Sequence, residues 1–117
     1  MTFDEYAMLA ARTAKSMGST TADLTHAALG IHTEGGEFAT EVKRAVIYNA
    51  FVDEARMAEE LGDLLWYIAL AANTLGVSLD KIAAHNFVKL RLRFPERYTD
   101  GHAEKRFDKG GLSARES

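Results

Sequence analysis

The chain has no cysteine among its 117 residues and only one proline, Pro95. The missing thiols exclude disulfides and thiolate chemistry, and they make a reducing cytoplasm the expected location. A single proline leaves almost every segment free to form a helix. No stretch approaches the roughly 18 uninterrupted apolar residues of a membrane span, so no membrane partner is expected. The N-terminus also lacks the basic and then apolar order of a secretion signal.

Positive charge is scarce as well, with 14 Lys and Arg against 17 Asp and Glu and a formal net charge of −3. Such a balance gives no general attraction to nucleic acid, so a nucleic-acid partner is not expected. If the protein handles phosphate, metal ions must offset the negative charge locally. The length and the 47% apolar content are ordinary for one globular domain.

Helical periodicity dominates what is present, and we predict four helices followed by a polar tail, with no strand. Thr2 and Glu5 have the spacing of a capping box at the start of the first helix. Gly18 and Gly76 follow the first and third helices as expected C-terminal glycines, and Pro95 stops the fourth. The predicted helices are 2–17, 22–49, 53–75 and 79–93.

The second and third predicted helices carry unusual features. Gly30, Gly35 and Gly36 lie inside the second helix, where each costs about 1 kcal/mol relative to Ala. They indicate either a break or a place where something packs or binds close to the backbone. The third helix has a wide apolar face. That predicted face comprises Leu61, Leu64, Leu65, Ile68, Ala71, Ala72 and Leu75.

Acidic residues recur at helical spacing on the same two helices. Glu34, Glu37 and Glu41 fall within about 60° of one another, and Glu60 and Asp63 are three positions apart. A carboxylate among apolar neighbours, as Asp63 is, costs several kcal/mol unless it is paired or binds a metal. Oxygen donors suit Mg²⁺, which in turn binds substrate phosphates. The alternative is a solvated acidic face, which is common at this spacing.

Three segments, taken in order, resemble the signature segments of MazG-like nucleotide pyrophosphohydrolases. Residues 27–37 read AALGIHTEGGE and are similar to the family's LG-x-x-x-E-x-x-E segment. Residues 59–67 read EELGDLLWY, and residues 86–95 read NFVKLRLRFP, close to N-x-x-K-L-x-x-R-Y-P. One E-x-x-E is weak evidence, but the three segments together form a specific pattern that covers roughly residues 20–98.

The resemblance implies an all-α fold of the NTP pyrophosphatase type, a four-helix bundle completed by dimer or tetramer packing. We place the catalytic domain at residues 1–98 and interpret the polar remainder, residues 99–117, as a mobile tail or as an arm that contacts a neighbouring subunit. The family's metal ligands map onto Glu34, Glu37, Glu60 and Asp63. These side chains would hold two or three Mg²⁺ ions, for which Mn²⁺ can substitute, and the glycines of the second helix would let metal and phosphate approach.

The activity implied is hydrolysis of a nucleoside triphosphate to a monophosphate and pyrophosphate, for nucleotide pool control or house-cleaning. Glu37 and Glu60 are the candidates for direct participation in catalysis, and Glu37 is favoured as the proton acceptor over Glu41 or Glu59. Asn86, Lys89 and Arg93 share one face of the fourth helix and would bind substrate phosphate. Alternatively, these cations only complement the dipole at the helix C-terminus.

Two other functions stay open. One is a non-catalytic dimerisation or regulatory module with the same fold, and the other is a dUTPase-like or phosphoribosyl-ATP pyrophosphatase-like specificity. In either case a homo-oligomer is expected, because four amphipathic helices of this width leave apolar surface that one subunit cannot cover. The expected partners are therefore the nucleotide substrate and further copies of the chain.

Overall fold

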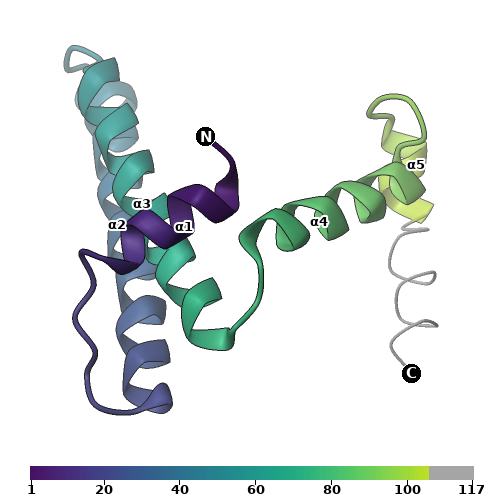
Figure 1. Ribbon diagram of the computed structural model, residues 1–117. Helices are drawn as coiled ribbons and strands as arrows, with labels where there is room; N and C mark the ends of the chain where they lie inside the picture. The colour runs from purple at the N-terminus through teal and green to yellow at the C-terminus, as the bar shows by residue number, and fades with distance from the viewer. Residues whose placement is uncertain (106–117) are drawn as a thin grey trace. The chain divides into compact units, whose positions relative to one another are not determined.

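The computed structural model describes residues 1–105, which contain five helices and no strand (Figure 1). The predicted all-α class is confirmed. The described helices are α1 (Phe3–Ala11), α2 (Thr20–Ile47), α3 (Glu54–Leu75), α4 (Leu79–Arg93) and α5 (Asp100–Lys105). The chain divides into two compact units, Met1–Leu79 and the part that starts at Asp80. The short α5 lies in the segment predicted to be a tail, and the remainder of that tail falls outside the described residues.

Helix α1 begins as predicted but ends earlier. The capping box is present, since Glu5 N donates to Thr2 Oγ1 at 3.0 Å and Thr2 N donates to Glu5 Oε1 at 3.3 Å. The helix ends at Ala11, so the predicted extension to residue 17 is wrong. Thr13 leaves the helical path, because its hydroxyl donates to Ala10 O and accepts a hydrogen bond from the Trp66 indole at 2.8 Å.

Helix α2 is continuous through its three glycines, so of the two alternatives left open for them the break does not occur. It starts after Ser19, whose side chain accepts from Ala22 N at 3.1 Å. Helix α3 has both of its predicted ends. The Asp53 carboxylate accepts from Arg56 N at 3.0 Å, and Gly76 terminates the helix with a left-handed φ of 68°.

Helices α2 and α3 pack side by side as an antiparallel pair (Figure 1). The direction follows from their contacts, because Gly30 meets Tyr67 whereas Glu41 meets Arg56. A Cβ atom on Gly30 would overlap the Tyr67 ring, so only glycine admits the ring at this position. The glycine therefore allows close contact between the helices, which was one of its two predicted roles.

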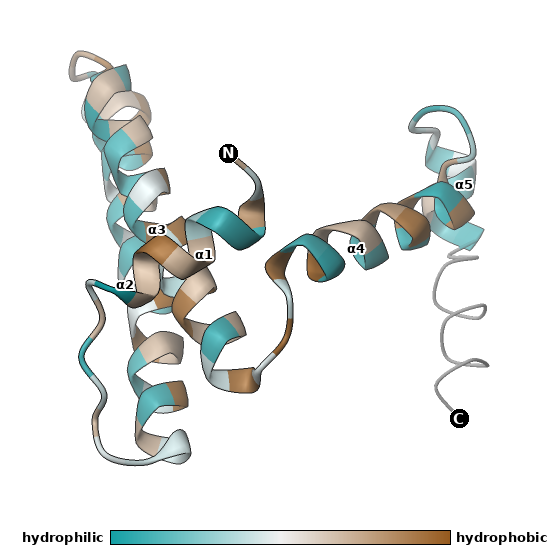
Figure 2. Ribbon diagram, viewed as in Figure 1, coloured by the Kyte–Doolittle hydropathy of each residue, from teal (hydrophilic) through white to brown (hydrophobic). Residues whose placement is uncertain are grey.

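Helix α1 lies across α3 and buries mainly alanines. Small side chains at these positions let the two helix backbones approach closely, and the apolar residues of both helices meet there (Figure 2). Asn73 Nδ2 also donates to Ala7 O at 2.9 Å, and the Ser78 hydroxyl donates to the Asp4 carboxylate. The buried core cluster comprises Ala7, Ala10, Ala69, Ala72 and Leu79.

The apolar face predicted for α3 is only partly buried within the chain. Leu61 is 49% exposed and Leu75 is 60% exposed, whereas Ala69 and Leu70, which the prediction omitted, are buried. The buried stripe follows the side of α3 that meets α1 and α2. Leu61 and Leu75 lie off that stripe, and the chain itself does not cover them.

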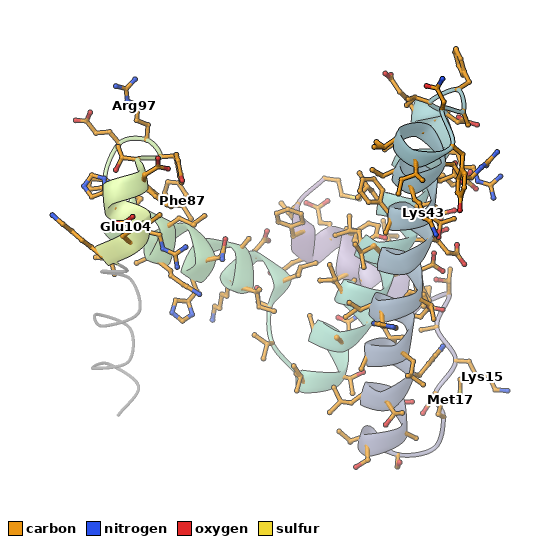
Figure 3. The ribbon with its side chains drawn as sticks, turned by 180° about the vertical axis from the view of Figure 1, so that it is seen from behind. Lys15, Met17, Lys43, Phe87, Arg97 and Glu104 are labelled. Atoms are coloured by element: carbon orange, nitrogen blue, oxygen red, sulfur yellow. The ribbon has the colours of Figure 1, made fainter. Side chains whose placement is uncertain are left out.

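In the second unit, α4 ends at Arg93, two residues before Pro95, as predicted. The rings of Phe94 and Tyr98 lie 5.0 Å apart between α4 and α5, and the Tyr98 hydroxyl donates to Asp100. Phe87 extends from α4 and is 60% exposed (Figure 3). Within the described residues, no single helix is long and apolar enough to cross a membrane. Helices α3 and α4 reach that length and composition only when counted together across their break.

Candidate metal centre

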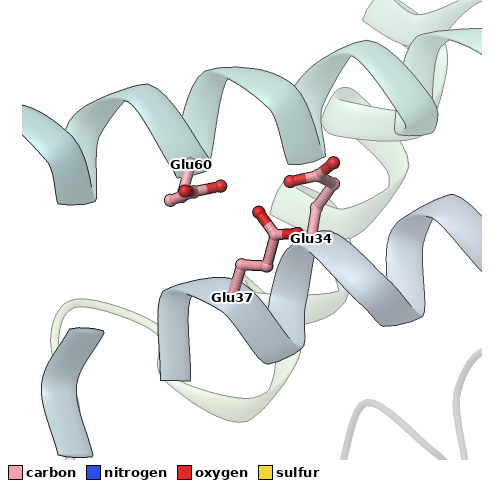
Figure 4. Close-up of side chains that lie close together, drawn as sticks. All are labelled: Glu34, Glu37 and Glu60. Carbon is pink, nitrogen blue, oxygen red and sulfur yellow. The ribbon is translucent and has the colours of Figure 1, made fainter. Parts of the chain in front are cut away.

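Three of the four predicted metal ligands come together between α2 and α3. Glu34 and Glu37 stand one turn apart on α2, and Glu60 faces them from α3 (Figure 4). One carboxylate oxygen from each lies within 4.8 Å of the other two. We call these three residues the acidic cluster. Its geometry follows directly from the helical spacing of the two acidic motifs and the antiparallel packing of their helices.

The acidic cluster is shielded from water on one side. Glu60 is only 8% exposed, and among the described residues it is the one charged residue that is buried. The Oε2 atoms of Glu34 and Glu60 are buried and have no hydrogen-bond partner in the described part of the chain. Leaving a buried carboxylate oxygen without a partner is costly. These two atoms therefore point to a positive group that belongs between the helices.

Burial and mutual repulsion change the proton affinity of the cluster. Burial first, and then the neighbouring Glu37 and Glu34 carboxyl groups, raise the pKa of Glu60 from its ordinary 4.5 to about 7. Burial and the charge of Glu37 likewise raise the pKa of Glu34. A protein without a cation in this place would hold a proton here near neutral pH.

Asp63, the fourth predicted ligand, lies three residues beyond Glu60 on α3 and outside the acidic cluster. Its side chain is exposed, yet it acts electrostatically on its surroundings. Burial and then the charge of Asp63 raise the pKa of Tyr6, and Asp63 adds a smaller part to the shift of Glu34. Its assignment as a metal ligand stays a prediction.

An ion pair that the sequence analysis missed lies next to the cluster. Arg56 Nε of α3 is 3.1 Å from Glu41 Oε1 of α2. Arg56 also lines an open hollow of about 440 Å³ beside Glu60, together with Asp53, Ala55 and Glu59. The only signal in the sequence is spacing, since Arg56 precedes Glu60 by one helical turn, but which α2 residue it would face depends on how the helices pack.

The glycines near the cluster have two different surroundings. The Tyr67 ring packs directly on Gly30 and occupies the space beside it, so the expectation that Gly30 admits metal or phosphate is wrong. A Cβ atom on Gly35 or Gly36 would meet nothing within 4 Å. For these two positions, the predicted approach of metal and phosphate remains sterically open.

Comparison with known proteins identifies the family of the chain. Residues 23–98 match the MazG nucleotide pyrophosphohydrolase domain. The chain belongs to the MazG family. It is also similar to the Gene 37 protein of Mycobacterium phage L5, with 32% identity over 116 residues that cover 91% of this chain and 100% of the phage protein. No solved structure matches the chain.

The MazG assignment places the chain in an enzyme family of the nucleotide pyrophosphohydrolase type, and the acidic cluster lies inside the matched residues. The cluster fits a divalent cation. Its donors are all carboxylate oxygens, which hard cations prefer, and opposite ligands of one Mg²⁺ lie about 4.2 Å apart. The observed span of up to 4.8 Å and the two unpartnered oxygens are compatible with such an ion after a small closure.

The predicted phosphate ligands of this MazG domain are all on α4. Asn86 is exposed, Lys89 and Arg93 are half-buried, and the Arg93 guanidinium lies 5.7 Å from the centre of the Phe94 ring. These residues belong to the second unit, whereas the acidic cluster belongs to the first. Their role in binding phosphate stays a prediction.

Proposed function

We propose that this protein is a Mg²⁺-dependent nucleoside triphosphate pyrophosphohydrolase. It converts a (d)NTP and water to a (d)NMP and pyrophosphate, in nucleotide pool control or house-cleaning. The observation that carries the proposal is the convergence of Glu34, Glu37 and Glu60, with two buried oxygens that lack partners, inside a MazG domain. Mn²⁺ is expected to substitute for Mg²⁺, because both accept oxygen ligands.

Glu34, Glu37, Glu60 and Asp63 would hold the cations. Mg²⁺, when bound, would lower the pKa of a bound water and neutralise the negative charge of the phosphates. Glu60, with its pKa of about 7, has to release its proton as the site loads. Glu37 is exposed and can take a proton from the attacking water and pass it to solvent, which favours it as the general base.

The other carboxylates considered as proton acceptors are less suited. The Glu41 carboxylate is already paired with Arg56 at 3.1 Å and with Arg44 at 3.6 Å, and it is not one of the three residues of the acidic cluster. Glu59 lines the hollow beside Glu60. Asn86, Lys89 and Arg93 are proposed to bind the phosphate oxygens, Arg93 through its planar guanidinium and Lys89 as a point charge.

We expect the active form to be a homodimer or homotetramer. Large apolar side chains of the first unit are exposed in the single chain, Phe51 by 97%. Exposed apolar surface of this extent is typical of a subunit interface. A stable monomer in sedimentation experiments would contradict this expectation. The other strongly exposed apolar residues of this unit include Val46, Ile47, Tyr48, Leu61 and Leu75.

The competing function is a non-catalytic dimerisation or regulatory module with the same fold. Against it stands the intact set of four acidic residues, because a chain that had lost catalysis would be expected to have lost at least one. A dUTPase-like or phosphoribosyl-ATP pyrophosphatase-like specificity would use the same acidic cluster and differ only in the substrate. The cytoplasmic location and the lack of nucleic-acid and membrane partners stay predictions.

A panel of NTPs and dNTPs tests the proposal, with pyrophosphate release measured with and without Mg²⁺. We expect release to require the cation and to be lost in Glu60→Gln and Asp63→Asn. Glu54→Gln is the matched control, because it removes a carboxylate from the first turn of α3, away from the cluster. Activity that survives both substitutions in the cluster region would overturn the proposal, and the preferred nucleotide would identify the substrate.

A further inference from the structure

An ion pair joins α2 to α3 beside the acidic cluster. Arg56 Nε and Glu41 Oε1 are 3.1 Å apart, and the Glu41 side chain is only 10% exposed, whereas that of Arg56 is 58% exposed. Arg44 also approaches Glu41, at 3.6 Å, but from the same helix. Of these two ion pairs, the one with Arg56 joins α2 to α3, and water screens it weakly on the side of the nearly buried Glu41 carboxylate.

The position of this pair relative to the cluster follows from helix geometry. Glu41 is four residues after Glu37, and Arg56 is four residues before Glu60, so each lies one turn from a cluster residue on the same side of its helix. The ion pair therefore lies one turn from the cluster, toward the connection between α2 and α3. Arg56 and Glu60 also line the same hollow.

The cluster itself pushes the helices apart. Three carboxylates with oxygens within 4.8 Å of one another repel each other when they are ionised. An attractive contact one turn away opposes the separation at the point where it acts. The packed contact of Gly30 with Tyr67 does the same on the other side of the cluster.

We propose that the Glu41–Arg56 ion pair is a positioning element that keeps α2 and α3 at the spacing where Glu37 and Glu60 share a divalent cation. The inference rests on the proposed metal site and extends it to two residues outside the acidic cluster. Loss of the Glu41–Arg56 ion pair weakens cation binding, because the cation must then draw the ligands of the two helices together each time it binds. The chemical step, once the site is loaded, proceeds as before.

Calorimetry with Mg²⁺ alone tests this on the full chain, without nucleotide. We expect Arg56→Gln and Glu41→Gln each to weaken Mg²⁺ affinity about five-fold, less than the roughly 10- to 100-fold effect of losing a partner bonded directly to a ligand. The rate of pyrophosphate release at saturating Mg²⁺ stays within about two-fold of that of the unchanged protein.

The charge-exchanged double variant, Glu41→Arg with Arg56→Glu, restores Mg²⁺ affinity, since it rebuilds the ion pair with its charges reversed. Circular dichroism and thermal unfolding verify that each variant is folded, and Arg56→Lys provides a conservative second variant.

Arg44→Gln is the matched control. This substitution removes one positive charge that is paired with the same Glu41 carboxylate, but it leaves the Glu41–Arg56 contact between the helices in place. The Mg²⁺ affinity should therefore stay unchanged. Equal weakening by Arg44→Gln would overturn the proposal, because general electrostatics would then explain the effect. Unchanged affinity in Arg56→Gln and Glu41→Gln would also overturn it, even in an active enzyme. If Arg56→Gln and Glu41→Gln weaken Mg²⁺ binding and Arg44→Gln does not, the positioning role is supported even when the protein hydrolyses no nucleotide. The absence of hydrolysis would then contradict the proposed function alone.

Discussion

The two ends of the α2–α3 pair are held together by different forces. At the packed end, Ala27 and Ala69 are fully buried and the Tyr67 ring lies on Gly30. At the acidic end, from Glu34 to Glu41 on α2 and from Arg56 to Glu60 on α3, carboxylates face one another and an ion pair connects the helices. Apolar contacts act under any ionic condition, whereas the acidic end depends on a proton or a cation. The packed end stabilises the fold, whereas the acidic end lowers its stability but forms the binding site.

Replacing Glu60 should have the largest effect, because it changes activity and stability in opposite directions. Glu60→Gln removes the buried carboxylate of the acidic end, so we expect kcat/KM for pyrophosphate release to fall by at least about 1000-fold, or roughly 4 kcal/mol. The metal-free protein should at the same time become more stable, because a crowded, poorly solvated charge is gone. Activity assays and thermal unfolding in EDTA check the two signs. A variant that lost both activity and stability would place Glu60 in the structural part of the fold.

Gly30→Ala attacks the packed end instead. The new methyl group would overlap the rigid Tyr67 ring, so we expect the free energy of unfolding to fall by about 2–3 kcal/mol. Gly36→Ala is the control, since its methyl group meets nothing and improves helix propensity by up to about 1 kcal/mol. Urea unfolding in EDTA measures both. Equal effects at the two positions would mean that the Tyr67 contact is not what fixes the spacing of the helices.

The sequence predicts those features of both ends whose causes are local. The capping box at Thr2, the start of the third helix near Asp53 and its C-terminal glycine, Gly76, each depend on residues within one helical turn, and all three are present. The early end of α1 was missed because Thr13 bonds to Trp66, which is 53 positions away in the chain. A local pattern carries no information about such a partner.

The site shows the same limit. Glu34, Glu37 and Glu60 could be named from acidic spacing and family resemblance, and the structure brings them together. The partners of Gly30 and Glu41 depend on the register between α2 and α3, which one sequence does not reveal. The choice of buried face on α3 depends on the same packing, so the exposure of Leu61 was not foreseen.

A smaller effect distinguishes the two ends by pH. A carboxyl group whose pKa is higher in the folded protein than in the unfolded chain binds more protons when folded, so acid favours the folded form. The pKa of Glu60 rises from 4.5 to about 7, and stability of the metal-free protein should therefore fall as pH increases across that interval. Added Mg²⁺ should flatten or reverse the trend, because the cation replaces the proton.

Thermal unfolding in EDTA at about pH 5 and about pH 7.5 measures this dependence. Glu60→Gln is the informative comparison, since its unfolding should lose most of the pH dependence while other carboxyl groups keep theirs. An unchanged dependence in Glu60→Gln would mean that the proton is held on a group other than Glu60.

The smallest effect concerns the bond that attaches α1 next to the packed end. Thr13→Val keeps the shape of the side chain but leaves the Trp66 indole without its 2.8 Å acceptor, so we expect a loss of about 1 kcal/mol in unfolding free energy. Thr25→Val is the control, because the Thr25 hydroxyl bonds only one turn back, to Thr21 O on α2, and its loss should cost less than about 0.5 kcal/mol. Mg²⁺ affinity should be unchanged in both variants if the packed end only supplies stability. Weaker Mg²⁺ binding in Thr13→Val would show that the two ends are coupled along α3, and that the position of α1 helps to set the spacing of the acidic cluster.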